Sequence, residues 1–239
     1  MKRFLLIVLL LPLSIFSQVE TQKKLPDPYA TKPVSNYSNV IGWEDGQTPK
    51  APAGFNVTKY ADGFQNPRWM YVTPNGDVLV AESNSNYSIL KQIGATIIGA
   101  GGSNNLAKSA DVITLLRDTD NDGMPDLRQT LLTKEDGLNQ PFGMLVIDNW
   151  LYVANTDAIL RYPYVPGQTK ISAKGKKIAD LPAGKVNQHW TRNILANADN
   201  SKIYIAVGSG DNIGEKGMEH ELLKANILVM DPDGSGLKV

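Results

Sequence analysis

The sequence predicts an all-β domain with the architecture of a β-propeller. Residues 66–83, 140–157 and 191–211 share one pattern: an apolar strand, a turn rich in Asn, Asp or Gly, and a second strand of the form Leu/Tyr-Val/Ile-Ala. Hairpins that recur at roughly 50-residue intervals are typical of propeller blades. No long helical periodicity competes after residue 55, although residues 219–225 could form a short helix. A β-sandwich with hairpins that match by chance is the alternative.

Small residues occupy equivalent positions in the three hairpins. Ala81, Ala154 and Ala206 correspond to one another, and small side chains would let strands approach closely near a crowded central axis. The first interval is longer than the second, and an acidic insertion is expected to account for much of the excess. Because one blade cannot bury both of its faces alone, blades stacked around an axis should bury them against each other.

The last residues of the chain predict an unfinished blade. Residues 226–239 read as a strand, a Pro-Asp-Gly turn and the start of another strand. The chain is therefore expected to hold an incomplete set of about three to four blades, whereas propellers close with four or more. We expect a domain truncated at its C-terminus, part of a longer protein, with exposed strand edges that favour aggregation.

The N-terminus predicts a targeting segment. Residues 1–17 read as a signal peptide, with Lys2 and Arg3 before an apolar stretch and a plausible cleavage site after Ser17. The stretch is short for a membrane span, so no span is expected after cleavage; an uncleaved anchor is the alternative. Residues 18–52 are polar and rich in Pro, which predicts an extended arm before a propeller domain at 53–239. A periplasmic or secreted location is expected.

Charge and cysteine content exclude several classes of protein. The chain has 24 Lys and Arg against 24 Asp and Glu, so no strong field exists to collect nucleic acid or an anionic membrane. It has no Cys, which excludes disulfides and thiol chemistry. Stability in an oxidising compartment must therefore come from packing.

A histidine at the mouth of the third hairpin is the strongest catalytic candidate. His189 is one of two histidines and lies beside Trp190 and close to Arg192. An imidazole in such a place can be aimed into a pocket and used as a base, because its neutral form is well populated near neutral pH. On the residues alone, a surface or packing histidine is the favoured alternative.

The chain resembles the pyrroloquinoline-quinone (PQQ)-dependent sugar dehydrogenases, which include the soluble quinoprotein glucose dehydrogenases; the sorbosone dehydrogenase-like branch is closest. The resemblance runs in collinear order over residues 55–239 and rests on five stretches: PRWMYVTPNGDVLVAES, DTDNDGMPD, PFGM with LYVANTDAILRYPY, HWTRN with IYIAVGSGDNIGE, and ANILVMDPDGSG. It implies a six-bladed propeller with quinone and substrate at one end of the axis, of which this chain would hold the first half. It also implies that His189 is the general base.

The resemblance suggests further side chains for the cofactor site. Arg192 and Arg68 offer planar forks for the cofactor carboxylates, with a rim ion pair as the alternative for either. Asn139 and Gln140 could contact cofactor or sugar, although turn amides are the plainer interpretation. Trp190 could stack on a ring or cap the core.

The acidic stretch 118–129 has the spacing of a calcium loop. The ligand candidates are Asp118, Asp120, Asp122, the Met124 carbonyl and Asp126. Gly123 supplies the sharp turn, but Gln129 stands where a bidentate Glu would complete the loop. We expect a structural Ca²⁺ here, distinct from any calcium that holds the quinone; a solvated acidic turn is the alternative.

The predicted function is quinone-dependent oxidation of an aldose or sugar aldehyde of the glucose or sorbosone type. PQQ and Ca²⁺ are the expected cofactors, a sugar the substrate, and an external carrier the electron acceptor. Two rivals stay open, because propellers host many activities. One is a calcium-dependent hydrolase or lactonase on the same fold; the other is a non-catalytic binding propeller in which His189 is incidental.

Overall fold

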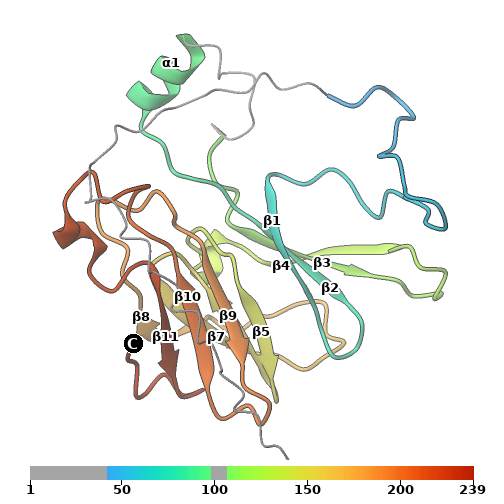
Figure 1. The fold of residues 1–239 in the computed structure, drawn as a ribbon. Helices are drawn as coiled ribbons and strands as arrows, with labels where there is room; N and C mark the ends of the chain where they lie inside the picture. The colour runs from blue at the N-terminus through green and yellow to red at the C-terminus, as the bar shows by residue number, and fades with distance from the viewer. Residues whose placement is uncertain (1–41, 98–106) are drawn as a thin grey trace, which may run out of the picture.

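The computed structural model describes residues 42–97 and 107–239, and its strands form three antiparallel sheets (Figure 1). The first sheet has the order β1-β2-β3-β4, with β1 Pro67–Val72, β2 Val78–Glu82, β3 Val112–Arg117 and β4 Leu127–Leu132. The middle sheet has the order β5-β6-β7-β8, with β5 Met144–Ile147, β6 Trp150–Ala154, β7 Ala158–Pro163 and β8 Lys176–Asp180. The third has the order β11-β10-β9, with β9 Arg192–Ala196, β10 Ile203–Val207 and β11 Asn226–Met230.

All three hairpins predicted from the sequence are present. They are the antiparallel pairs β1–β2, β5–β6 and β9–β10, and each opens one sheet. The strand expected after residue 226 is β11, and Val229 then forms a bridge with Lys238. Three sheets of four, four and three strands agree with the expected incomplete set of blades.

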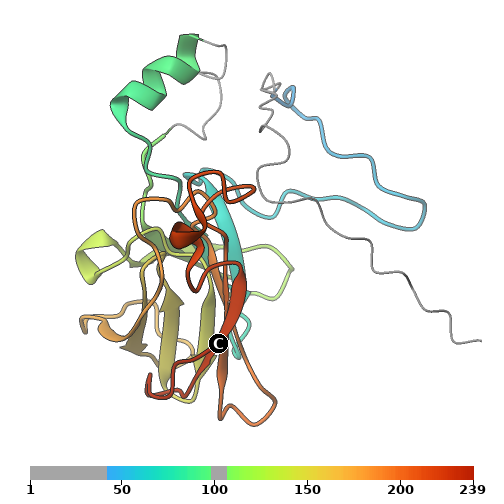
Figure 2. The same ribbon diagram turned by 60° about the vertical axis from the view of Figure 1, so that its left-hand side comes forward.

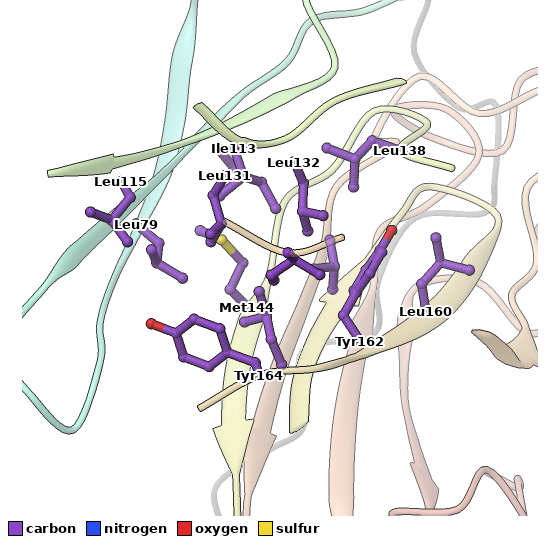
Figure 3. Packing of buried hydrophobic residues seen from close by; sticks show 14 residues of the cluster. Leu79, Ile113, Leu115, Leu131, Leu132, Leu138, Met144, Leu160, Tyr162 and Tyr164 are labelled. Atoms are coloured by element: carbon purple, nitrogen blue, oxygen red, sulfur yellow. The ribbon is translucent and has the colours of Figure 1, made fainter. Parts of the chain in front are cut away.

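The middle sheet is buried on both faces because it lies between the other two. Along β6, Leu151 and Val153 pack into a cluster shared with the first sheet, whereas Tyr152 packs into a cluster shared with the third. Alternate side chains of a strand point to opposite faces, so a strand covered on both sides is apolar throughout. Figure 3 shows the first cluster, with Leu79 and Leu115 of the first sheet facing Met144 of the middle one.

The first strands of the sheets lie next to one another, β1 beside β5 and β5 beside β9. At the closest approach, Gly143 donates its backbone N–H to the carbonyl of Arg192 at 2.9 Å. A Cβ on Gly143 would lie 2.7 Å from the backbone N of Ile194, so only glycine fits. Glycine at this position therefore performs the role that the sequence suggested for small residues.

The outward faces of the two end sheets expose apolar side chains. Met70 and Val72 on β1 are 65% and 64% exposed, and Leu195 on β9 is 68% exposed. The three alanines that the sequence analysis treated as equivalent differ in burial. Ala81 and Ala154 are fully buried, but Ala206 points out of the third sheet. It has no neighbouring sheet to pack against within the described residues.

One expectation about the segments between strands was wrong. The long first interval comes from the β2–β3 connection, residues 83–111, which carries the helix α1 (Ile89–Ile97). The acidic stretch is only the turn of the β3–β4 hairpin. Figure 2 shows α1 standing clear of the sheets. The helix considered at 219–225 is a short 3-10 helix, η4 (Met218–Glu221). Another 3-10 helix, η3 (Lys134–Asp136), follows β4.

The N-terminal expectations are only partly covered by the structure. The signal peptide at 1–17 and residues 18–41 of the arm lie outside the described residues. Residues 42–66 contain turns but neither helix nor strand, so the division into arm and propeller domain stays a prediction. Among residues 42–97 and 107–239, no helix has the length and apolar character needed to cross a bilayer.

Candidate active site

A polar hollow of about 650 Å³ opens at one end of the three sheets. Its wall comes from residues 85–88 after β2, residues 139–140 before β5, residues 156–157 after β6 and residues 183–190 before β9. Lys216, in the loop after β10, completes it. These segments all lie where first strands begin and second strands end, so one end of the fold collects loops from every sheet.

His189 lines this hollow and its side chain is exposed. Its Nδ1 lies 2.7 Å from the hydroxyl oxygen of Ser209, which follows β10. Among the described residues no hydrogen bond is formed by Nε2. The imidazole is therefore held through one ring nitrogen while the other stays free for a ligand.

Arg192 lies beneath the loop that carries His189 and does not line the hollow. One terminal nitrogen donates to the carbonyl of His189 at 2.9 Å, and the other donates to Asn187 Oδ1 at 2.8 Å. The guanidinium is fully buried, and burial lowers its pKa to about 10, against a smaller opposing effect of the Asp157 charge. Direct contact with a cofactor stays a prediction, whereas the observed contacts fasten the loop.

Among the described residues, little negative charge balances the guanidinium of Arg192. None of the ion pairs among residues 42–97 and 107–239 includes it, and its Nε is buried without a hydrogen-bond partner there. Lys224 lies nearby, with its ammonium on the carbonyl of Val186. Burial, and to a lesser degree the Arg192 charge, lower the pKa of Lys224. Two cations thus support the 183–190 loop from behind.

Asn139 and Gln140 both line the hollow, and contact with a ligand stays a prediction for them. The amide of Asn139 donates to Asp157 at 3.0 Å, and that of Gln140 donates to the carbonyl of Asn84 at 2.7 Å. Gln140 has a φ of 48°, a left-handed conformation that is uncommon for a residue with a side chain and occurs often at functional sites. Its backbone N–H donates to Asp111 at 2.8 Å, which helps to hold that conformation.

Trp190 also lines the hollow, but only 3% of it is exposed. The guanidinium of Arg68 lies over its ring, 5.2 Å from the centroid, and Phe142 meets it edge-on at 6.3 Å. Arg68 is exposed and lies outside the hollow. Much of the indole surface is thus already covered by protein; stacking on a cofactor stays a prediction for Trp190, as carboxylate binding does for Arg68.

The short run 83–85 connects the first sheet to both other sheets at the wall of the hollow. The hydroxyl of Ser83 donates to the carbonyl of Pro141 at 2.6 Å, just before β5. The hydroxyl of Ser85 accepts the indole N–H of Trp190 at 2.7 Å, just before β9. Ser85 and Trp190 both line the hollow, so this part of its wall is held by a bond between connections of two different sheets.

Asp211 organises the loop after β10. Its carboxylate is 1% exposed and accepts the backbone N–H groups of Glu215 and Lys216 at 3.1 and 2.9 Å. Burial alone would raise the pKa of Asp211, but these and neighbouring backbone hydrogen bonds lower it below its ordinary value. The carboxylate thus serves to fix the loop that carries Ser209.

Sequence reasoning missed Ser209, Asn187 and Lys216 as members of the site. Ser209 lies in a Gly-Ser-Gly run at the end of the hairpin that His189 opens, so hairpin pairing could have placed it near His189, although not in contact with the ring. Asn187 bridges Arg192 to the hydroxyl of Thr156, where its amide donates at 2.8 Å. Nothing in the local pattern distinguishes Lys216 from a solvated lysine.

The acidic loop brings Asp118, Asp120 and Asp122 together, with ligand oxygens within 4.8 Å of one another. A backbone hydrogen bond from Asp122 lowers the pKa of Asp120, but the charge of the Asp122 carboxylate and of its neighbours raises it overall. Asp126 lies outside the group because its carboxylate accepts the backbone N–H and the hydroxyl of Thr119. Three crowded carboxylates suit a hard cation such as Ca²⁺.

Comparison with known proteins gives a consistent result. The profile of the TrAA12-like family matches residues 49–233. The structure is similar to the holo form of the PQQ domain of pyranose dehydrogenase from Coprinopsis cinerea, with a TM-score of 0.50 and 14% identity over 73% of this chain and 35% of that one. It is similar to the calcium structure of the AA12-family enzyme from Trichoderma reesei, with a TM-score of 0.50 and 14% identity over 72% and 36% of the two chains.

The PQQ-bound aldose sugar dehydrogenase from Streptomyces coelicolor matches with 16% identity and a TM-score of 0.46, over 74% of this chain and 48% of that one. No curated protein sequence matches the chain significantly. At such identities the first two structures show the fold, and they confirm that the three sheets are part of a β-propeller. The chain spans about a third of the length of those two proteins.

Proposed function

The chain belongs to the TrAA12-like family, a family of pyrroloquinoline-quinone-dependent oxidoreductases, and from this premise we propose that it contributes to the oxidation of a sugar by a bound quinone. The observation that carries the proposal is the place of His189 in the polar hollow. Its Nδ1 is engaged by Ser209, and its Nε2 has no partner among the described residues.

The hollow fits an anionic ring cofactor. PQQ carries carboxylates, and the hollow is lined by two basic residues, Lys185 and Lys216, against one acidic residue, Asp157, together with Asn139 and Asn187. The weakly matched charge of Arg192 behind the loop adds positive potential there. Lys216 and the amides are the groups that we expect to hold the cofactor.

His189 is proposed to act as the general base. An imidazole that lines the hollow can take the proton of a sugar hydroxyl in the transition state, provided that the hydroxyl comes within hydrogen-bond distance of Nε2. The bound quinone supplies the acceptor for the hydride. The chain itself contributes orientation: the Asn139 and Gln140 amides line the same hollow and can fix sugar hydroxyls relative to His189.

A structural Ca²⁺ is proposed for the acidic loop. The loop lies at the turn between β3 and β4, whereas the hollow is formed by other connections. A cation there would neutralise Asp118, Asp120 and Asp122 and hold the hairpin turn, and it would take no part in proton transfer. This role matches the expectation from the sequence, although Asp126 is engaged elsewhere.

The decisive experiment measures sugar-dependent dye reduction after the protein is supplied with PQQ and Ca²⁺. Glucose and sorbosone are the first substrates to test, with an artificial dye as the electron acceptor. His189→Gln should remove turnover while PQQ binding, followed by its absorbance, is retained. His220→Gln is the matched control, because it changes the other of the two histidines and lies outside the hollow. Equal loss in both variants would reject the assignment of the base.

The same preparation separates the rival functions. Hydrolysis of a sugar lactone without quinone would favour the hydrolase, and sugar binding with neither reaction would favour a binding propeller. Among the described residues, the only grouping of three metal-ligating side chains is the acidic loop, away from the hollow. The dehydrogenase is preferred because the TrAA12-like family model matches residues 49–233. Secretion or export to the periplasm is proposed as well, and sequencing the N-terminus of the mature protein would test cleavage after Ser17.

A further inference from the structure

We propose that Ser209 is a positioning residue that fixes His189 in the neutral tautomer with its proton on Nδ1 and its lone pair on Nε2. The catalytic meaning of this inference depends on the proposed function. The tautomer itself does not, because it follows from hydrogen bonds within this chain.

The hydroxyl of Ser209 has one proton and two neighbouring groups that could accept it. The hydroxyl oxygen of Ser209 lies 2.7 Å from His189 Nδ1 and 2.8 Å from the carbonyl oxygen of Asp211. A carbonyl oxygen can only accept, and a serine hydroxyl carries a single proton. If that proton goes to Asp211, the bond to the imidazole requires a proton on Nδ1. A neutral imidazole has only one N–H, so Nε2 is left as an acceptor.

The carbonyl that orients Ser209 is itself fixed. The Asp211 carboxylate is buried and accepts N–H groups from its own loop, including that of Lys216. On its other side, Glu221 in η4 accepts the N–H of Asp211 at 3.0 Å and that of Gly210 at 2.6 Å. Because both faces of this turn are bonded, the Asp211 carbonyl has little freedom to turn away from the Ser209 hydroxyl.

The backbone of His189 is fixed at two further points. Its carbonyl accepts a hydrogen bond from the Arg192 guanidinium, and the backbone N–H of the preceding residue, Gln188, donates to the carbonyl of Gly210 at 2.7 Å. Gly208 passes directly against it: an added Cβ would overlap the His189 carbonyl oxygen and lie 2.9 Å from the His189 Cβ. The Gly-Ser-Gly run therefore contacts His189 in two ways. Ser209 forms a hydrogen bond with the ring, and Gly208, which has no side chain, leaves room for the His189 backbone.

The consequence is a base prepared before substrate arrives. In the Nδ1–H tautomer, Nε2 can accept the proton of a hydroxyl in one step, as the O–H bond breaks and an N–H bond forms. The Nδ1–H then donates to Ser209 in both the neutral and the charged ring, so the hydrogen bonds need not be rearranged during the transfer. In the opposite tautomer Nε2 would present a proton to the hydroxyl and could not act as the base.

The test is nitrogen NMR of the imidazole in the ¹⁵N-labelled protein under mildly alkaline conditions, where a neutral ring is observed. The His220→Gln background leaves a single histidine, so assignment is direct. Ring shifts and couplings identify which nitrogen carries the proton. Wild-type Ser209 should give the Nδ1–H form. Ser209→Ala should move the ratio of tautomers toward Nε2–H by about three- to tenfold, the value of one neutral hydrogen bond.

Two further variants make the result specific. Ser209→Thr keeps a hydroxyl and should retain the Nδ1–H form, and Ser201→Ala removes a hydroxyl from an exposed turn and should change nothing. An Nε2–H ring in the protein with Ser209 intact would overturn the inference even if Ser209→Ala failed to fold. So would an unchanged spectrum in a folded Ser209→Ala protein.

Turnover provides the link to the proposed function. In the dye assay, Ser209→Ala should lower kcat by about three- to tenfold with little change in KM, and Ser209→Thr should restore it. If wild-type protein gives the Nδ1–H spectrum but no sugar-dependent reduction, the proposed function fails while the tautomer assignment stands. If the wild-type protein reduces the dye but its spectrum shows Nε2–H, the tautomer assignment fails while the proposed function stands.

Discussion

Gly208→Ala is the substitution for which the structure gives the sharpest prediction. The new methyl group would overlap the His189 carbonyl oxygen and lie 2.9 Å from the His189 Cβ, both far inside ordinary contact distance. Either the end of β10 or the histidine must move by on the order of 1 Å, and a displacement of that size at a reacting group costs about 100-fold in rate. Forcing a methyl into a packed site also costs about 1–3 kcal/mol of folding free energy.

Two measurements separate these effects. Thermal unfolding gives the stability cost, and dye reduction at a temperature where both proteins are folded gives the turnover. Gly94→Ala is the control, because a Cβ at Gly94 meets nothing within 4 Å and its φ is not left-handed; it should keep normal turnover. A folded Gly208→Ala protein with wild-type kcat would show that the position of His189 does not limit the reaction, and the reasoning would be refuted.

Three other predictions follow from the fold. Asp120→Asn should weaken Ca²⁺ binding and reduce the rise in melting temperature on adding Ca²⁺, measured by calorimetry, with chelation of the wild type as the reference; an equal rise in both proteins would contradict the loop site. Burial raises the pKa of Asp77, but two hydrogen bonds from Arg117, at 2.7 and 2.8 Å, and a neighbouring amide hold it below 3.8. The pair should therefore stabilise the fold fully above about pH 4 and lose its effect as the pH falls further; Asp77→Asn should cost about 1–2 kcal/mol at neutral pH and flatten this acid dependence in urea titrations. Leu151→Ala, in the buried strand of the middle sheet, should lower the free energy of unfolding by about 2–5 kcal/mol. Leu195 is 68% exposed, so Leu195→Ala should change it by less than about 0.5 kcal/mol. Similar losses in the two variants would mean that the third sheet is covered in solution.

The fold could be predicted from the sequence where the local preference of a segment and its tertiary surroundings favour the same structure. In β6 the run WLYVA is apolar at every position because both faces are buried, and the two-residue turn before it is explicit. The opposite holds for α1. Its sequence ILKQIGATI contains β-branched residues and a central Gly94, which disfavour a helix, and Ile89 and Ile97 are exposed instead of marking a buried face.

The site was accessible only in part, for a related reason. The family resemblance named His189, Trp190, Asn139 and Gln140 together, and in the structure they lie just before β5 and β9 and line one hollow. The partner of His189 is Ser209, which follows the second strand of the same hairpin, where Val207 of β10 pairs with Arg192 of β9. The register of the hairpin brings the two segments together, whereas the side-chain contact itself depends on backbone path and on glycine clearance.

The bonds that run from residues 83–85 to Pro141 and to Trp190 have a consequence for ligand binding. Because they join connections of different sheets, and because Ser85 and Trp190 stand at the rim of the hollow, we expect ligand affinity and the rigidity of the packed sheets to be coupled. A molecule that tightens the rim should slow amide exchange deep in the middle sheet, far from any atom that it touches.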